Sequence, residues 1–487
     1  MLFCLHQYYS EHFLFCFALK LLFFVVAIKE ENMRRQSRRE KAQVAVQALV
    51  ENPYVPEFLE LRVYDVHGYS KGRLVATCRD ADVFETGTGL SGSICYFGVK
   101  GQVNDHPDLW DGVGLANKQL VPIKSTLKPG LKDIRGNHNV ATVLCDLKLS
   151  DGTLDPTSPR QVALQQLARL KDELGLSIWS SFEAEFGVTD SETKKPLGNN
   201  FNNWTSLVVM ERAQETLLDL TNAMEEIGIK IDTLQSECGI GQFEITFAPT
   251  LGIEAADMAA GFKTSAYVYL QQKGYNAEFM TCVNPHDGCR NGFHYNFSLW
   301  TEEGKNAFLD PDAPNNLSEL GRHWLAGLVE HAPGMLALNA PTINCYRRVG
   351  TPWAPTWANW GPDDRLASYR LKREAGHNVY VESRLPSSAC SPHLILASLL
   401  AAGLDGVRRK LELPEPGGQA RRLPATLEGA LQALDEDAPL KQALGEKMVE
   451  FFVYTKRTYE VEEFKAFQSL SDQEMLEKEK EYYYLPY

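Results

Sequence analysis

The chain has 487 residues, of which 44% are hydrophobic and 23% are charged, so it can bury a sizeable core and is not disordered as a whole. Asp and Glu number 63 against 49 Lys and Arg, a formal net charge of -14, which disfavours nucleic acid as a partner because phosphates repel an acidic surface. The 10 cysteines include no C-x-x-C pair, so we expect reduced, mostly buried thiols rather than a disulfide scaffold or a structural zinc site.

The N-terminal region holds an apolar run over residues 13–28, which is short for a membrane span and carries Lys20 near its middle. A basic stretch begins at Met33. Three interpretations stay open: a weak membrane anchor, a signal peptide, and an upstream extension with Met33 as the working start. We favour the last. We therefore expect residues 1–52 to be a poorly ordered extension of a cytoplasmic protein that does not bind membranes.

Short strand-like runs dominate residues 58–149 and predict a small, strand-rich N-terminal domain over residues 53–150. Ser158 followed by Pro159 predicts the start of a helix, because serine is a good helix cap and proline suits the first helical position. From there strands and amphipathic helices alternate irregularly. Residues 151–487 are expected to form a larger second domain.

Four later segments alternate like strands and carry reactive polar side chains on one face. The residues of these faces are Glu183 and Glu185, then Gln242, Glu244 and Thr246, then His294, Asn296 and Ser298, and finally Glu382 and Arg384. A solvated polar face explains any one such strand but fits four of them poorly. If the faces converge, their carboxylates cannot all stay ionised without cations between them. Carboxylates with one imidazole suit Mg²⁺ or Mn²⁺ better than zinc.

Arginines form a second group of candidates. Arg347, Arg348, Arg365, Arg370 and Arg384 lie beside aromatic and strand residues. A solvated basic face is the alternative, but the planar guanidinium suits bidentate binding of carboxylates and phosphates. Metal ions with converging arginines indicate phosphoryl transfer from a nucleotide. The sequence has no G-x-x-x-x-G-K-[ST] loop and no protein-kinase signature, which excludes those two nucleotide-binding folds.

Six short segments, taken in order, resemble the motif set of the glutamine synthetase family. They are E-A-E-F (183–186), E-C-G-I-G-Q-F-E (237–244), N-G-F-H-Y-N-F-S-L-W (291–300), N-C-Y-R-R (344–348), W-G-P-D-D-R-L-A-S-Y-R (360–370) and V-E-S-R-L-P (381–386). The resemblance covers roughly residues 55 to 487. It implies an α+β fold, with a small N-terminal β-grasp-like domain and a catalytic domain (the glutamine synthetase fold) in which helices flank a curved antiparallel sheet.

The resemblance also implies roles for single residues. Those that match ligands of one Mg²⁺ or Mn²⁺ ion are Glu185, Glu237 and Glu244, and those that match ligands of a second ion, which bridges the ATP phosphates, are Glu183, His294 and Glu382. Arg348 and Arg384 match arginines that bind glutamate. Arg365 matches one that neutralises the transferring phosphoryl group, so Arg365 and Arg384 are the catalytic candidates. Arg370 and Ser298, with Arg365, are the candidates for contact with ATP.

The implied reaction has two steps. The γ-carboxylate of glutamate takes the γ-phosphoryl group of ATP, and an amine then displaces phosphate from γ-glutamyl phosphate. The implied partners are glutamate, ATP, an amine and further copies of the chain in a homo-oligomeric ring, often a dodecamer.

The chain departs from the family pattern at several positions. Asn296 stands where bacterial-type members have a second histidine, and Arg290 where a flexible glycine is expected. His393 ends the segment that matches N-P-Y. The segment nearest to the ammonium-binding motif D-G-S-S of the family begins at Ser91 and contains no aspartate. Trp353 stands where ammonia-using members carry a glutamate.

The changes at Ser91 and Trp353 resemble members that use larger amines, or none. Two functions therefore stay open. The first is an ATP-dependent glutamate–ammonia or glutamate–amine ligase, which the complete set of metal ligands favours. The second is a catalytically inactive structural or interaction protein resembling lengsin, which the loop changes favour.

Overall fold

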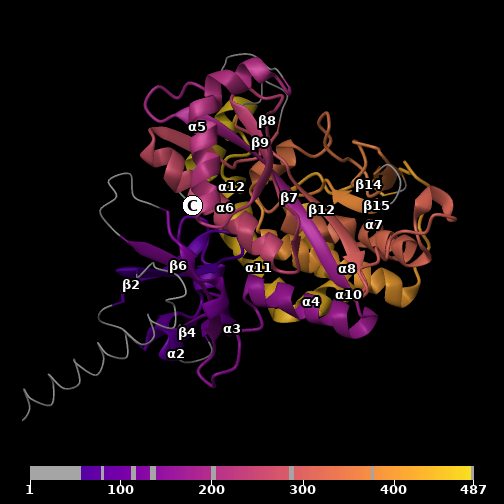
Figure 1. Ribbon diagram of the computed structural model, residues 1–487, viewed down its shortest axis with the longest axis horizontal. Helices are drawn as coiled ribbons and strands as arrows, with labels where there is room; N and C mark the ends of the chain where they lie inside the picture. The colour runs from indigo at the N-terminus through magenta and orange to yellow at the C-terminus, as the bar shows by residue number, and fades with distance from the viewer. Residues whose placement is uncertain are drawn as a thin grey trace, which may run out of the picture.

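The computed structural model describes residues 56–77, 82–110, 117–131, 139–198, 204–283, 290–374, 378–419 and 421–483 (Figure 1). The extension expected over residues 1–52 lies outside the described residues. Within these ranges, no helix is both long and apolar enough to cross a bilayer. Helices and strands combine in a mixed fold, in agreement with the expected α+β class.

A small sheet domain comes first and lies to one side of the molecule (Figure 1). Its described strands are arranged in the order β2-β1-β6-β4-β3, with β5 paired to β6, and only the β1–β6 pair is parallel among them. The bounds are β1 (Phe58–Tyr64), β2 (Ser70–Ala76), β3 (Thr88–Ser91), β4 (Asn117–Pro122), β5 (Lys128–Pro129) and β6 (Val140–Lys148). In β6 every second residue, from Ala141 to Leu147, is buried, as the period of a strand requires. The domain boundaries at 53 and 150 stay a prediction.

A larger sheet follows, with its described strands in the order β13-β14-β15-β12-β7-β9-β8 and with β10 and β11 paired to β7. The bounds are β7 (Ser177–Asp190), β8 (Ile231–Ser236), β9 (Gln242–Phe247), β10 (Thr250–Leu251), β11 (Tyr275–Glu278), β12 (Phe293–Trp300), β13 (Trp360–Pro362), β14 (Tyr369–Glu374) and β15 (Asn378–Ser383). Apart from β13 with β14, the described pairs are antiparallel.

Helices cover the apolar face of the larger sheet. Phe262 of α6 packs edge-on against Phe186 of β7 and Phe247 of β9. The principal helices are α4 (Pro159–Leu174), α5 (Leu207–Glu226), α6 (Glu254–Gln272), α7 (Glu319–Asn339), α8 (Pro392–Arg409), α9 (Leu427–Glu436), α10 (Ala438–Leu444), α11 (Glu446–Lys456), α12 (Glu462–Lys465) and α13 (Asp472–Tyr483); α2 (Val83–Thr86) and α3 (Pro107–Trp110) are short. The start of α4 is the predicted one, with Ser158 as the cap.

The cysteines follow the expectation with one exception. Five of the described cysteines are buried and free: Cys95, Cys145, Cys282, Cys345 and Cys390. Cys238 is disulfide-bonded, so the expectation of reduced thiols is wrong at this position. Spacing along the chain could not reveal this, because a disulfide forms only where the fold brings two thiols into the required geometry.

Candidate active site

The larger sheet brings candidate metal ligands together from adjacent strands. In the strand register, His294 of β12 lies opposite Glu183 of β7, and Glu244 of β9 lies opposite Glu185 of β7. Glu382 belongs to β15, the other neighbour of β12. Directly paired residues point to the same face of a sheet. The polar faces predicted from the alternation therefore converge.

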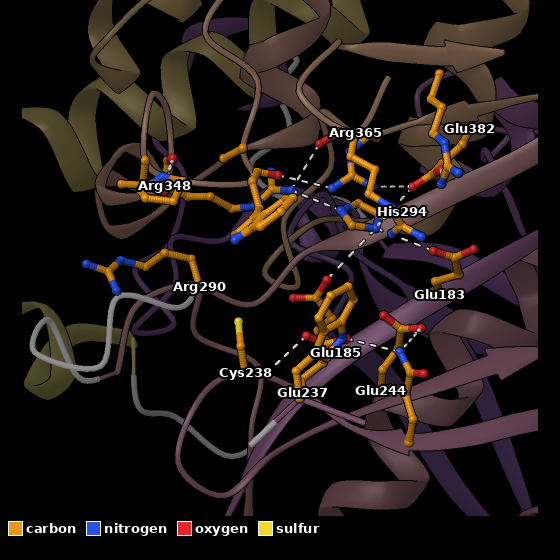
Figure 2. A pocket seen from close by; sticks show the side chains of 18 of the residues that line it. Glu183, Glu185, Glu237, Cys238, Glu244, Arg290, His294, Arg348, Arg365 and Glu382 are labelled. Atoms are coloured by element: carbon orange, nitrogen blue, oxygen red, sulfur yellow. Dashed lines mark hydrogen bonds and ion pairs between the residues drawn. The ribbon is translucent and has the colours of Figure 1, made fainter. Parts of the chain in front are cut away.

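These faces line a cavity of about 350 Å³ (Figure 2). The predicted residues along it are Glu183, Glu185, Glu237, Glu244, His294, Arg348, Arg365, Arg370, Glu382 and Arg384. Ser298 lies apart from them, in a neighbouring cavity of about 340 Å³ that Trp179 and Tyr380 also line. Glu183 and Lys372 line both cavities, which therefore adjoin.

One end of the first cavity has the donor set of a divalent metal site. Ligand atoms of Glu183, His294 and Glu382 all lie within 4.8 Å of one another. His294 Nδ1 lies 3.4 Å from a Glu183 oxygen and 3.6 Å from a Glu382 oxygen. Carboxylates with one imidazole suit Mg²⁺ or Mn²⁺, so the residues present fit such an ion.

Positive side chains surround the same three ligands, and we call this the cation-rich end. Arg370 Nη1 lies 3.2 Å from a Glu382 oxygen, and Arg384 contacts the other oxygen of that carboxylate. Lys372 Nζ lies 3.1 Å from Glu382 and 3.4 Å from Glu183. The carboxylates of this end are therefore paired even without a metal ion.

The other end of the cavity holds Glu185, Glu237 and Glu244, and we call it the carboxylate-rich end (Figure 2). Neutral groups supply most of its hydrogen bonds. Gln235 Nε2 donates to Glu237 at 3.1 Å and to Glu244 at 3.2 Å, and the indole of Trp204 donates to Glu237 at 3.1 Å. Neutral donors do not balance negative charge, so the carboxyls of this end would repel one another if all were ionised.

The pKa values separate the two ends. Burial, followed by repulsion from neighbouring carboxylates, raises the pKa of Glu244 to about 10. Burial also raises the pKa values of Glu185 and Glu237. For Glu183 and Glu382 burial again acts upward, and Glu183 repels Glu382, but nearby His294 and Lys372, joined by Arg384 at Glu382, outweigh these effects and both pKa values are lowered. A divalent cation bound among these carboxyls would stabilise their ionised forms and so remove the cost of their mutual repulsion.

The arginines present donors to the cavity. The Nε atoms of Arg370 and Arg384 are buried and donate no hydrogen bond within the described chain. Buried donors without acceptors are costly, and the guanidinium groups that carry them belong to residues that line the cavity. Arg365 lies over the Trp204 ring, with its guanidinium carbon 5.9 Å from the ring centroid.

Arg348 is held at the floor of the cavity. Its Nη2 donates to His294 Nε2 at 3.1 Å, and Nη1 donates to the backbone oxygen of Leu385 at 3.3 Å. Burial, followed by the charge of Arg384, lowers the pKa of Arg348 to about 10. Arg347 takes no part, because its side chain turns away to Glu479 and Asp472 of α13.

Several residues that differ from the family pattern also lie at the site. Asn296 donates from Nδ2 to Glu183 at 2.8 Å, and Arg290 lines the cavity while its Nε donates to the Arg347 backbone. Trp353 lines the cavity in a left-handed conformation, with φ of 68°. Its ring centroid lies 6.2 Å from that of Trp204. Ser91, in β3, lies outside both cavities.

Lys372, Gln235 and Trp204 were missed by sequence reasoning. For Lys372 a signal existed, because it follows Arg370 by two residues and so shares its face of the strand. Gln235 likewise stands two residues before Glu237. Trp204 precedes a helix and gives no such signal.

Comparison with known proteins gives consistent results. The pattern described as "Glutamine synthetase, catalytic domain" matches residues 156–476. The glutamine synthetase of Thermus thermophilus is 33% identical over 354 residues, which is 68% of this chain and 77% of that protein. The glutamine synthetase of Mycobacterium bovis is 31% identical over 431 residues, or 82% and 92% of the two chains.

Solved structures agree. A structure described as a novel glutamine synthase homolog superposes with a TM-score of 0.77 and 25% identity, covering 88% of this chain and 99% of that one. A GmaS/ADP complex gives a TM-score of 0.76 at 24% identity, covering 88% and 98%. The chain therefore belongs to the glutamine synthetase family.

Proposed function

We propose that this protein is an ATP-dependent ligase that joins the γ-carboxyl of glutamate to an amine through γ-glutamyl phosphate. The observation that carries this proposal is the convergence, in one cavity, of six metal-ligand candidates with four predicted arginines. Among them are two buried guanidinium Nε atoms that lack acceptors. Such a cavity can hold a carboxylate and a phosphoryl group side by side.

The proposed metal ions are Mg²⁺ or Mn²⁺. Glu183, His294 and Glu382 would hold one ion, and Glu185, Glu237 and Glu244 the other. When bound, such ions neutralise developing negative charge on the phosphoryl oxygens. The presence of all six candidate ligands in one cavity supports this assignment.

The arginines divide the remaining work. Arg348 and Arg384, which are buried at the floor, would bind the glutamate carboxylates and orient the γ-carboxylate for attack on phosphorus. Arg365 and Arg370 would stabilise the charge on the transferring group. The base of ATP would lie in the second cavity beside Ser298, where Trp179 and Tyr380 offer aromatic surface.

For the acceptor we propose a primary amine with a neutral alkyl or aryl substituent. Trp204 and Trp353 line the cavity, and their side chains are 49% and 55% exposed, so they offer apolar surface to a substituent. Arg290, Arg365 and Arg384 line the same cavity as the carboxylates, so the two tryptophan rings, rather than net charge, favour a larger substituent on the amine.

The test is phosphate release from ATP by residues 33–487 with glutamate, Mn²⁺ and a panel of ammonium, hydroxylamine, methylamine, phenethylamine and putrescine. Release that needs both glutamate and an amine supports the ligase. The acceptor is tested with Trp353→Gly, which removes the ring while glycine tolerates the positive φ. We expect the preference for phenethylamine over hydroxylamine to fall about tenfold, the effect of roughly 1.4 kcal/mol. Leu218→Ala, on the exposed face of α5, is the control.

A catalytically inactive protein resembling lengsin is the second candidate. The ammonium of Lys372 among the metal ligands favours it, because a fixed cation could make a metal ion dispensable. Absence of both Mn²⁺ and ATP binding in calorimetry would rule out the ligase and leave this candidate.

We further propose a homo-oligomeric ring, of the dodecameric kind that members of the family often form, in the cytoplasm where ATP and glutamate are available. The exposed Trp204 and Trp353 at the cavity support a neighbouring subunit that covers it. Light scattering on the purified chain measures the ring size directly. A monomer that still releases phosphate would contradict the ring without affecting the ligase.

A further inference from the structure

Lys372 occupies the place where a divalent ion would meet its ligands. Its Nζ lies 3.1 Å from a Glu382 oxygen, 3.4 Å from a Glu183 oxygen and 3.1 Å from the side-chain oxygen of Asn296. Glu183 and Glu382 also belong to the group, with His294, whose atoms gather within 4.8 Å. An ammonium ion and a divalent ion would therefore compete for the same two carboxylates.

The surroundings of Lys372 hold its ammonium group close to the two carboxylates. Its side chain is 17% exposed, and oxygens of Glu183 and Glu382 both lie within 3.4 Å of Nζ. Its strand neighbours differ. Arg370, two residues earlier, pairs with Glu382 but has no contact with Glu183, whereas Arg373 faces Asp363 near the surface. Among the described residues, Lys372 is thus the lysine or arginine that bridges Glu183 and Glu382.

Lys372 also borders the second cavity. Together with Glu183 it lines both cavities, so it stands at their junction. Its Nζ lies 5.5 Å from the centroid of the Tyr380 ring, which lines the second cavity and offers the ammonium an alternative contact. A nucleotide with its base in the second cavity and its terminal phosphate in the first must pass this point.

We propose that Lys372 is an exchangeable cation of this site, which competes with the divalent ion for Glu183 and Glu382 and binds the nucleotide phosphates once the ion has displaced it. This role deepens the proposed function and rests on it for the identity of the nucleotide. The ligand class assigned to Lys372 is a nucleoside di- or triphosphate. The charges stay balanced in this exchange. The divalent ion takes over the two carboxylates, and the ammonium of Lys372 pairs with phosphate oxygens instead.

The test compares Lys372→Met with the unchanged full chain in two binding measurements made without turnover. Titration with Mn²⁺ alone, followed by calorimetry, is expected to show at least about tenfold tighter binding in the variant, because the competing charge is gone. Titration with ADP in saturating Mn²⁺ is expected to show at least about fivefold weaker binding, because a phosphate partner is lost. A general loss of structure would weaken both.

Arg373→Met is the matched control, since it removes a positive charge from the next residue on the same strand, where the side chain is 40% exposed. We expect less than twofold change in either titration. Equal or weaker Mn²⁺ affinity in Lys372→Met would overturn the competition, and unchanged ADP affinity would overturn the phosphate role. If Lys372→Met binds Mn²⁺ more tightly and ADP more weakly, but the unchanged protein forms no product, the ligase is contradicted and the role of Lys372 is not. The two proposals can therefore fail separately.

Discussion

The two ends of the active-site cavity bury the same kind of side chain in opposite electrostatic surroundings. At the cation-rich end, Glu382 is 1% exposed and is compensated by Arg370, Lys372 and Arg384. At the carboxylate-rich end, Glu244 accepts a hydrogen bond from the neutral Gln235 and faces other carboxylates. Burial alone therefore does not set the charge state of these residues; the partners do.

The difference bears on how each end would respond to a metal ion. At the carboxylate-rich end an ion would relieve repulsion and gain affinity from it. At the cation-rich end an ion must first displace positive side chains from Glu183 and Glu382. We therefore expect the first ion to bind at the carboxylate-rich end, with Glu185, Glu237 and Glu244, and the second to bind more weakly.

The largest expected effect is on the cation-rich end. In the metal-free protein, Glu382→Gln should lower the free energy of unfolding by about 3 kcal/mol, because the buried Arg384 loses its carboxylate partner and the half-buried Arg370 and Lys372 each lose one of theirs. Denaturation by urea with a chelator present measures this change. Asp363→Asn serves as the control, since Asp363 is 54% exposed and pairs only peripherally with Arg370; its cost should be close to zero.

The opposite sign is expected at the carboxylate-rich end. Glu244→Gln should raise the free energy of unfolding of the metal-free protein by roughly 2 kcal/mol at pH 8, because it removes a carboxyl that the folded protein must keep protonated at that pH. The same variant should lose Mn²⁺ affinity at this end. If both Glu→Gln variants destabilise the metal-free protein, the contrast between the two ends is wrong.

The third prediction concerns pH. The pKa of Glu244 is raised from 4.5 to about 10 on folding, so the folded protein holds a proton that the unfolded chain releases. The contribution of Glu244 to the free energy of unfolding is largest below pH 4.5 and falls as the pH rises toward 10, by up to about 1.4 kcal/mol per pH unit.

Melting temperatures of the metal-free protein should accordingly fall between pH 6 and pH 8, and Glu244→Gln should flatten this slope. Added Mn²⁺ should stabilise the protein more at pH 8 than at pH 6, because ionised carboxylates bind it. A metal-free protein that becomes more stable over this range would contradict the raised pKa of Glu244, because Glu183 and Glu382, whose pKa values are lowered, change stability only below about pH 4.5.

The smallest effect is expected from Asn296→Ala. Asn296 Nδ2 donates to Glu183 at 2.8 Å, and Asn296 Oδ1 accepts from Lys372. The substitution therefore removes one hydrogen-bond partner from Glu183 and one from Lys372. We expect a loss of about 1 kcal/mol in the free energy of unfolding. Asn296→Asp, a variant of nearly equal shape, should cost more, because a new negative charge would face Glu183. The two urea curves decide between a hydrogen-bond role and simple filling of space.

Sequence reasoning reached most of this site through strand periodicity. Glu183 and Glu185 were placed on one face by alternation, and the register confirms that they face His294 and Glu244. It failed where position depends on packing between distant elements. Ser298 lies in the second cavity, and Arg347 turns to α13, because neither direction follows from the local pattern.

The sequence by itself determined the family, the strand faces and the start of α4, since each depends on residues close together in the chain. Only the tertiary structure decided which carboxylates meet cations and which meet one another. Lys372 reaches Glu183 across 189 positions of sequence, and Trp204 reaches Trp353 across a comparable distance. Such contacts are set by how the strands and loops pack in space, and their electrostatic consequences appear only once the side chains share a cavity.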